Sequence, residues 1–401
     1  MKKEYDIYSG ARRLEKVTFS AIRVIIDKAA SLRSQGHSVI PFSAGEPDFN
    51  TPSDIKAATI DAINQNFTHY GSNRGLPKLR ELIAEDIIEE TQVSYNPETE
   101  IIVTSSGAEA INNAILSVID EGDEVIVFTP AFVSYENLIK LCQGVFIDIP
   151  LKPENQFQID IEEVKSKITV KTKMIIMNNP CNPTGAVYEK ETFEELSKLV
   201  LKRNLLVLTD EMYSKLTYDG VKFFSIANYP GMKERTIMVN GFSKTYAMTG
   251  WRLGYIAADA RLVNSIMKVH QYSTTCSPTF IQVGLANAMH SENTKNEVRH
   301  MIGEFEKRRK MMLEGLDKID KLSYITPYGA FYIMVNVRET GLTGEEFAKK
   351  LIEEKYVATV PAVSLGKECA DFIRISFAAS NEDIIEGLKR MKEFVENLIK
   401  K

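Results

Sequence analysis

The chain contains the runs IIVTSS (101–106), EVIVF (124–128), VFIDI (145–149), KMIIMNN (173–179), LLVLTD (205–210), TIMVNGFSK (236–244) and RLGYIA (252–257). Most are continuously apolar rather than alternating, which is typical of strands covered on both faces. Several segments between them have helical length and periodicity, such as residues 191–203. These observations predict an α/β fold built on a seven-stranded, mostly parallel sheet.

The last of these runs differs from the others in its spacing. Too few residues separate RLGYIA from TIMVNGFSK for a crossover helix, and parallel neighbours need such a connection. We therefore expect the strand at residues 252–257 to run antiparallel to the rest.

The two ends of the chain have a different character. An amphipathic helix at 19–35 stopped by Gly36, strand-like VIPFS (39–43) and a helix opened by Thr51 and Pro52 come first. A charged helix (292–319), the strand pieces AFYIMV (330–335), YVATV (356–360) and DFIRISFA (371–378), and a final helix (381–399) follow the sheet. This pattern reads as α+β. We expect a large domain at 46–285 and a smaller α+β domain formed by 1–45 with 286–401.

Composition excludes several classes of protein. The 401 residues carry a net charge of -5 and no uninterrupted basic stretch, so no nucleic-acid partner is expected. No apolar run approaches the roughly 18 residues of a membrane span. The cysteines lack disulfide or zinc spacing, so we expect no metal and a cytoplasmic location. They are Cys142, Cys181, Cys276 and Cys369.

Polar residues follow three of the predicted strands directly. They are residues 179–185 (NPCNPTG), 210–213 (DEMY) and 241–244 (GFSK). Ligands of an open parallel sheet bind outside the carboxyl ends of its strands. We therefore expect one cleft to receive all three segments.

These segments belong to a longer series of motifs that spans nearly the whole chain. The series is AGEPDF (44–49), HYGSNRGLPKLR (69–80), SSGAEA (105–110), NNPCNPTG (178–185), DEMY (210–213), SKTYAMTGWRLGY (243–255) and FIRISFA (372–378). In this order and context the chain resembles the class I aminotransferases of fold type I, which use pyridoxal 5'-phosphate (PLP). The resemblance implies that fold, that cofactor and that activity.

The resemblance assigns three catalytic residues. Lys244 would form the Schiff base with the cofactor and then move a proton between the substrate Cα and the cofactor. Asp210 would keep the pyridine nitrogen protonated, although an aspartate at a strand end can equally be a helix N-cap. Tyr213, with Asn182, would donate to the cofactor's phenolic oxygen; Asn182 alone could be turn chemistry before Pro183.

The phosphate and the ring of the cofactor have candidate partners too. Ser106, Gly107 and Ala108 open a helix, and a helix N-terminus binds anions. By resemblance the remaining cofactor contacts are Ser243, Arg252, Phe132 stacked on the ring, and Tyr70 reaching the phosphate of a neighbouring subunit. A homodimer with shared sites is implied.

Substrate recognition is implied at three positions. Arg374 would bind the α-carboxylate as a bidentate cation, Gly45 lies in a loop over that carboxylate, and Asn182 would assist. By resemblance Glu109 occupies the place where some aspartate-specific relatives have a lysine for the distal carboxylate, so we expect it to face an acidic side chain and repel it. Residues 271–278 also lack the arginine of other dicarboxylate-specific members. Strict aspartate specificity is therefore in doubt. No role is given to the histidines, which are His37, His69, His270, His290 and His300.

These residues lead to one function and one alternative. We expect a ping-pong aminotransferase that moves an amino group from an L-amino acid to a 2-oxo acid, with 2-oxoglutarate as the expected acceptor. The alternative is a carbon-sulfur β-lyase, because the same fold and cofactor support β-elimination. The amino donor stays open.

Overall fold

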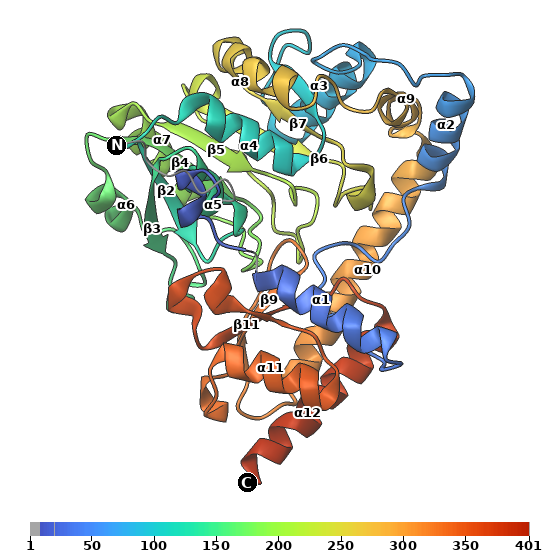
Figure 1. The fold of residues 1–401 in the computed structure, drawn as a ribbon, viewed down its shortest axis with the longest axis vertical. Coiled ribbons are helices and arrows are strands. Elements are labelled where there is room, and N and C mark those ends of the chain that lie inside the picture. Colours follow the sequence, from blue (N-terminus) through green and yellow to red (C-terminus); the bar gives the residue numbers. More distant parts are fainter. Residues whose placement is uncertain (1–8, 20, 401) are drawn as a thin grey trace.

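The structure, a computed structural model, describes residues 9–19 and 21–400. Its larger sheet has seven strands in the order β1-β7-β6-β5-β4-β2-β3. The strands are β1 (Ile101–Thr104), β2 (Glu124–Thr129), β3 (Val145–Pro150), β4 (Thr172–Asn178), β5 (Leu206–Asp210), β6 (Thr236–Gly241) and β7 (Gly254–Ala257). The predicted α/β fold with a seven-stranded sheet is confirmed (Figure 1).

The short connection between β6 and β7 agrees with the antiparallel direction of β7. Strands β2 to β6 pair in parallel with one another, whereas β7 is antiparallel to both β1 and β6. Strand β7 is the predicted exception, RLGYIA. Only one short 3-10 helix, Thr249–Trp251, lies between β6 and β7, which is too little for a parallel crossover.

Helices cover both faces of this sheet. On β4, the side chains of Met174 and Ile176 lie on one face of the sheet, and those of Ile175 and Met177 lie on the other. The first face is covered by α4 (Gly107–Val118), α5 (Ser134–Leu141) and α8 (Ala260–Ser273). The second face is covered by α6 (Ile161–Lys167) and α7 (Lys190–Arg203), together with α2 (Ser53–Asn64), α3 (Pro77–Thr91) and α9 (Thr279–Ala288). This double coverage explains why the strand runs are apolar without alternation.

The helices are α1 (Ala21–Ser34), α2 (Ser53–Asn64), α3 (Pro77–Thr91), α4 (Gly107–Val118), α5 (Ser134–Leu141), α6 (Ile161–Lys167), α7 (Lys190–Arg203), α8 (Ala260–Ser273), α9 (Thr279–Ala288), α10 (Glu292–Leu316), α11 (Gly344–Lys355) and α12 (Asn381–Ile399). Figure 1 shows α10 running from the region of α2 and α9 toward the C-terminal part of the chain, and α1 lying near α11. Ala29 of α1 packs with Ile352 of α11. Among the described residues, no helix has both the length and the apolar composition needed to cross a membrane.

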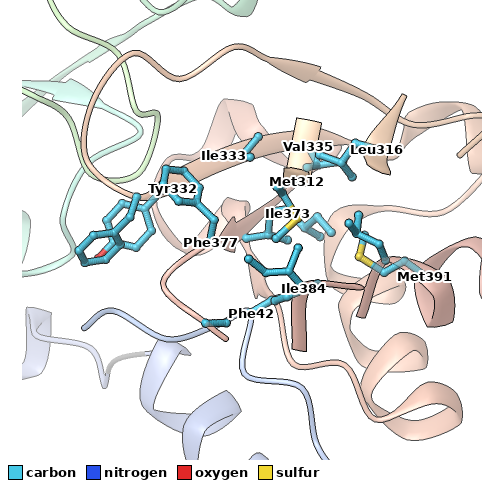
Figure 2. Close-up of a cluster of buried hydrophobic side chains, with 14 of the residues drawn as sticks. Phe42, Met312, Leu316, Tyr332, Ile333, Val335, Ile373, Phe377, Ile384 and Met391 are labelled. Atoms are coloured by element: carbon cyan, nitrogen blue, oxygen red, sulfur yellow. The ribbon is translucent and has the colours of Figure 1, made fainter. Parts of the chain in front are cut away.

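A smaller antiparallel sheet lies in the C-terminal part. Its order is β10-β11-β9-β8, from β8 (Ser323–Ile325), β9 (Tyr332–Asn336), β10 (Val360–Pro361) and β11 (Phe372–Ser376). Its core joins distant segments, and Figure 2 shows Phe42, Ile373 and Ile384 gathered in this cluster. The division at residues 45 and 285 stays a prediction.

Two sequence expectations here were wrong. VIPFS is not a strand, because Ile40 makes only an isolated bridge to Val357. YVATV contributes a strand only from Val360, which pairs with Arg374. Both segments are short and packed, so their β-branched residues reflect burial against α1 and α11 rather than a ladder.

Candidate active site

A cavity of about 540 Å³ opens where β4, β5 and β6 end and α4 begins. The three strands end level with one another, since Asn178 pairs with Asp210 and Asp210 with Val239. The polar segments after the strands therefore meet in one place. The lining residues that the sequence singled out are Gly45, Ser106, Gly107, Ala108, Phe132, Asn182, Asp210, Tyr213, Ser243, Lys244, Arg252 and Arg374.

The first turn of α4 forms one wall. Ser106 is its N-cap, and its backbone has φ 110°, a conformation that costs energy in a residue with a side chain. The loop lies close to β7: a Cβ added to Gly254 would lie 2.7 Å from the backbone nitrogen of Gly107. Free amides at a helix N-terminus, beside Ser243 and Arg252, form a wall suited to an anion.

Asp210 lies at the end of β5 with its carboxylate held from two sides. The Tyr135 hydroxyl donates to Oδ2 at 2.7 Å, and the Met212 amide donates to Oδ1 at 3.1 Å. Burial raises the pKa of Asp210, while these hydrogen bonds and the charge of Lys244 oppose the rise. A fixed carboxylate at this depth suits a protonated ring nitrogen.

Lys244 follows β6 and extends into the cavity. Its Nζ donates to the Gly45 carbonyl at 2.5 Å and lies 5.8 Å from the centre of the Phe331 ring. Loss of solvent, together with the charges of Arg374 and Arg252, lowers the pKa of Lys244 to about 8, although Glu46 and Asp210 oppose the fall. An amine with such a pKa is available as a free base near neutral pH.

Arg374, on β11, is 2 % exposed and faces the same cavity. Its Nη1 donates to Asn182 Oδ1 at 3.1 Å and its Nη2 to the Ser43 carbonyl at 3.2 Å. Its Nε has no hydrogen-bond partner among the described residues. A buried guanidinium with an unused donor is a site for a carboxylate.

Tyr332, on β9, was not found from the sequence. Its ring lies 4.4 Å from the guanidinium carbon of Arg374, and its hydroxyl lies 3.0 Å from that of Tyr213. Burial raises the pKa values of both tyrosines, so both stay protonated donors. The apolar run AFYIMV carries no polar signal that would have separated Tyr332 from a core tyrosine.

Helix α1 was predicted, but not its place at the cavity. Ile22, Ile26, Ala29 and Arg33 line the cavity from this helix. The sequence could show only an amphipathic helix, because nothing in its periodicity names the surface that it covers.

Two predicted residues are placed differently from the others. Tyr70 is 88 % exposed and is not among the described residues that line the cavity.

The expectation that Glu109 would face an acidic substrate was wrong. Its side chain turns away from the cavity and bonds the Ser105 amide, Asn113 and His270, because a residue three after the N-cap points back along its helix.

Comparison with known proteins agrees with this geometry. The family model "Aminotransferase class I and II" matches residues 37–391. The chain is 41% identical to the aspartate aminotransferase of Pyrococcus abyssi over 381 residues, which cover 95% of this chain and 97% of that protein. It is 38% identical to aromatic-amino-acid aminotransferase 2 of Thermococcus litoralis, with the same coverage.

A solved structure is similar over nearly its whole length. The aspartate aminotransferase from Thermus thermophilus with maleate superimposes with a TM-score of 0.91 at 35% identity, covering 96% of this chain and 99% of that one. The chain belongs to the class I and II aminotransferase family, and it is an aminotransferase that depends on PLP.

The residues present fit that cofactor. The cavity combines a partly shielded lysine amine, a buried carboxylate and a helix N-terminus beside an arginine. These are the groups that an aldehyde, a ring nitrogen and a phosphate require.

Proposed function

We propose that this protein transfers the amino group of an L-amino acid to a 2-oxo acid by a ping-pong mechanism. Lys244 is the residue that holds the cofactor covalently and moves the proton, and 2-oxoglutarate is the proposed acceptor. The observation that carries the proposal is the meeting of Lys244, Asp210 and Arg374 in one cavity. This set supplies a base, a partner for a ring nitrogen and a carboxylate anchor.

The cofactor would be held at both ends. Ser106, Gly107, Ala108, Ser243 and Arg252 would bind its phosphate, since they form the anion-suited wall. Asp210 would bind the ring nitrogen, Phe132 would lie against the ring, and Asn182 and Tyr213 would donate to the phenolic oxygen. PLP, when bound, supplies an electron sink for the bond that breaks at the substrate Cα.

Lys244 would act as the general base. Its Nζ would take the proton from the substrate Cα and later return a proton on the way to the 2-oxo acid. The pKa of about 8 supports this role, because a large share of the amine is unprotonated at neutral to mildly alkaline pH. The Gly45 carbonyl, which accepts from Nζ, orients it.

Arg374 would orient the substrate through its α-carboxylate, with Gly45 and Asn182 beside it. Tyr332 would fix the guanidinium from its ring face. The same anchor suits the carboxylate of an amino acid and of a 2-oxo acid, and this supports one site for both half reactions.

The names of the relatives and the residues of α1 that line the cavity indicate which donors to test. The relatives are named for aspartate and for aromatic amino acids, and the names support an aminotransferase over a carbon-sulfur lyase. Helix α1 brings both apolar side chains and Arg33 to the cavity. We therefore propose that aspartate and an aromatic amino acid are the first donors to test.

Tyr70 supports a homodimer with shared sites. Its side chain is exposed in a single chain and lies away from its own cavity. We propose that Tyr70 of each subunit reaches the cofactor phosphate in the cavity of the neighbouring subunit.

The test is a half reaction. Single amino acids are added to the PLP-loaded enzyme without any 2-oxo acid, and the cofactor absorbance is followed. A shift with aspartate or phenylalanine, with one equivalent of 2-oxo acid formed per site, is expected, and initial-rate lines against both substrates should be parallel. Continuous release of pyruvate and ammonia from cysteine conjugates without an acceptor would point to the lyase.

A further inference from the structure

His270 is a fully buried histidine of α8 that the proposed mechanism does not use. Its Nε2 lies 2.8 Å from the carbonyl oxygen of Asn73, and its Nδ1 lies 2.8 Å from Oε1 of Glu109. The ring is 0 % exposed, and the Glu109 side chain is 13 % exposed. The ring is therefore shielded from solvent, and protein atoms satisfy both of its nitrogens.

The geometry fixes the protons of this pair. A backbone carbonyl only accepts, so Nε2 of His270 is the donor to Asn73. A neutral ring would then turn the lone pair of Nδ1 toward the Glu109 carboxylate, which is repulsive. The pair makes both hydrogen bonds only with one more proton. That proton belongs on Nδ1 of His270, because the two Glu109 oxygens also accept from the Ser105 amide and from Asn113 Nδ2. His270 and Glu109 together then carry no net charge.

Glu109 holds the loop from which α4 begins. Its Oε2 accepts from the Ser105 amide at 2.5 Å, and its Oε1 also accepts from Asn113 Nδ2 at 2.7 Å. Ser105 directly precedes Ser106, Gly107 and Ala108, which line the cavity. An uncompensated carboxylate behind this wall would oppose any anion bound in front of it.

The same histidine reaches a second loop. Asn73, which accepts from His270, also donates from Nδ2 to the Thr275 carbonyl at 2.8 Å. Its loop, residues 69–75, contains Tyr70, and the Thr279 hydroxyl donates to the His69 carbonyl at 2.8 Å. His270 therefore connects the start of α4 to the loop that carries Tyr70.

We propose that His270 is a positioning residue for the cofactor phosphate. It cancels the charge of Glu109 behind the start of α4 and fixes that start to the Tyr70 loop. The inference rests on the proposed phosphate position. It goes beyond the proposed function because neither residue touches the cavity contents, and it makes His270 and Glu109 a charge pair rather than two independent contacts.

The test is a charge-matched set of variants measured on the apoprotein. His270→Gln leaves Glu109 charged. Glu109→Gln removes the charge and keeps one oxygen that can accept from the Ser105 amide and one NH2 that can donate to a neutral Nδ1 of His270. The double variant is neutral again. The dissociation constants of PLP and of pyridoxal, which lacks the phosphate, are measured by protein fluorescence. His290→Gln is the matched control, since His290 Nε2 lies 2.8 Å from Asp86 Oδ1 outside the cavity lining.

We expect His270→Gln to weaken PLP binding about tenfold while pyridoxal binding changes little, which corresponds to one charge acting near a helix N-terminus. Glu109→Gln and the double variant should bind PLP within about threefold of wild type, and His290→Gln should match wild type. Restoration by the second substitution is the mark of charge compensation. A double variant as weak as or weaker than His270→Gln, or equal losses for PLP and pyridoxal, would show that the pair serves packing alone.

Two further measurements separate the possible failures. Arg252→Gln should weaken the binding of PLP but not that of pyridoxal. If neither Arg252→Gln nor His270→Gln has this effect, the proposed phosphate position is wrong and the inference fails with it. If only Arg252→Gln does so, the inference on His270 fails alone. Should His270→Gln not fold, nitrogen-15 spectra of histidine-labelled wild type decide: two protonated ring nitrogens support the pair, and an unprotonated Nδ1 overturns it.

Discussion

The hydroxyl of Tyr135 donates a 2.7 Å hydrogen bond to Oδ2 of Asp210. Tyr135 lies in α5 and is 1 % exposed, while Asp210 ends β5 at the cavity wall. The bond therefore links the helix layer to the carboxylate proposed for the ring nitrogen. It stabilises the ionised form of a carboxyl group whose pKa burial raises.

Replacing Tyr135 with phenylalanine should make Asp210 harder to ionise. The pKa of Asp210 already lies above its unfolded value, so ionisation in the folded state costs stability as pH rises through that range. Without the hydroxyl this pKa rises further. We expect Y135F apoprotein to lose about 2 kcal/mol of unfolding free energy near pH 8 and less near pH 4, measured by urea denaturation.

Tyr218→Phe is the control for this change. The buried Tyr218 hydroxyl donates to the Ala330 carbonyl at 2.5 Å, so its partner is a neutral carbonyl and not a carboxylate. Its loss of stability should not vary between pH 4 and 8. If Y135F shows the same flat dependence, the hydroxyl does not support the charge of Asp210.

The sequence predicted the sheet, and every predicted site residue except Tyr70 lines the cavity, but it did not predict the contacts that support them. Strand runs covered on both faces leave a strong local pattern, and so do the polar residues that follow β4, β5 and β6. Tyr135, Tyr332 and His270 sit in ordinary apolar or amphipathic patterns, and only the packing of distant elements shows which side chain each one reaches. Glu109 illustrates the same point, because a motif position gives no side-chain direction.

The amine of Lys244 should become reactive near pH 8. Below its pKa of about 8 it is protonated and cannot attack an aldehyde; above it the free amine predominates. An unperturbed lysine would need a pH above 10. Attachment of pyridoxal to the apoprotein, trapped by borohydride and counted by mass spectrometry, should rise with a midpoint near pH 8, and Lys244→Ala should lack this product.

Glu46→Gln tests in which direction the charge of Glu46 shifts the pKa of Lys244. The Glu46 charge raises the pKa of Lys244, so its removal should move the midpoint to lower pH. The opposite movement, or a midpoint that stays above pH 10 in the wild type, would contradict this account of the lysine.

Arg374→Ala should separate substrate binding from cofactor binding. Two lost charge-assisted hydrogen bonds should raise the amino-acid KM about 100-fold, while the cofactor stays attached through Lys244. Arg374→Lys should raise KM about tenfold, because an ammonium cannot bind a carboxylate in the bidentate manner. Steady-state kinetics together with the cofactor absorbance report both quantities.

Arg309→Lys tests whether this effect belongs to the cavity. Arg309 is 2 % exposed, donates to the Pro327 carbonyl and pairs with Asp219 at 2.7 Å. Its substitution should lower stability and leave KM unchanged. An unchanged KM in Arg374→Ala would remove the arginine from the proposed substrate site.

Glu109→Gln should not change donor preference at saturating PLP. The carboxylate bonds Ser105, Asn113 and His270 instead of facing the cavity. The ratio of kcat/KM for aspartate to that for phenylalanine should stay within about twofold of wild type. A tenfold gain for aspartate, equivalent to about 1.4 kcal/mol, would mean that Glu109 reaches the substrate side chain.

Mixing two inactive variants should restore activity if sites are shared. A Lys244→Ala subunit lacks the base but keeps Tyr70, and a Tyr70→Ala subunit keeps the base but lacks the tyrosine. In a hybrid dimer, the cavity with Lys244 receives Tyr70 from its partner and is complete. After joint refolding, half of the dimers are hybrids with one complete site each, so activity should reach about a quarter of wild type.

The measurement must distinguish a Tyr70 that contributes to the cavity of the neighbouring subunit from a Tyr70 that contributes to the cavity of its own chain. If Tyr70 served the cavity of its own chain, no mixture could contain a complete site, and activity would stay at the level of the Tyr70→Ala subunits alone. Measurements at limiting PLP make the difference largest, because the tyrosine is proposed to bind the phosphate. Sedimentation of the mixture as dimers, with no gain in activity, would place Tyr70 outside the neighbouring site.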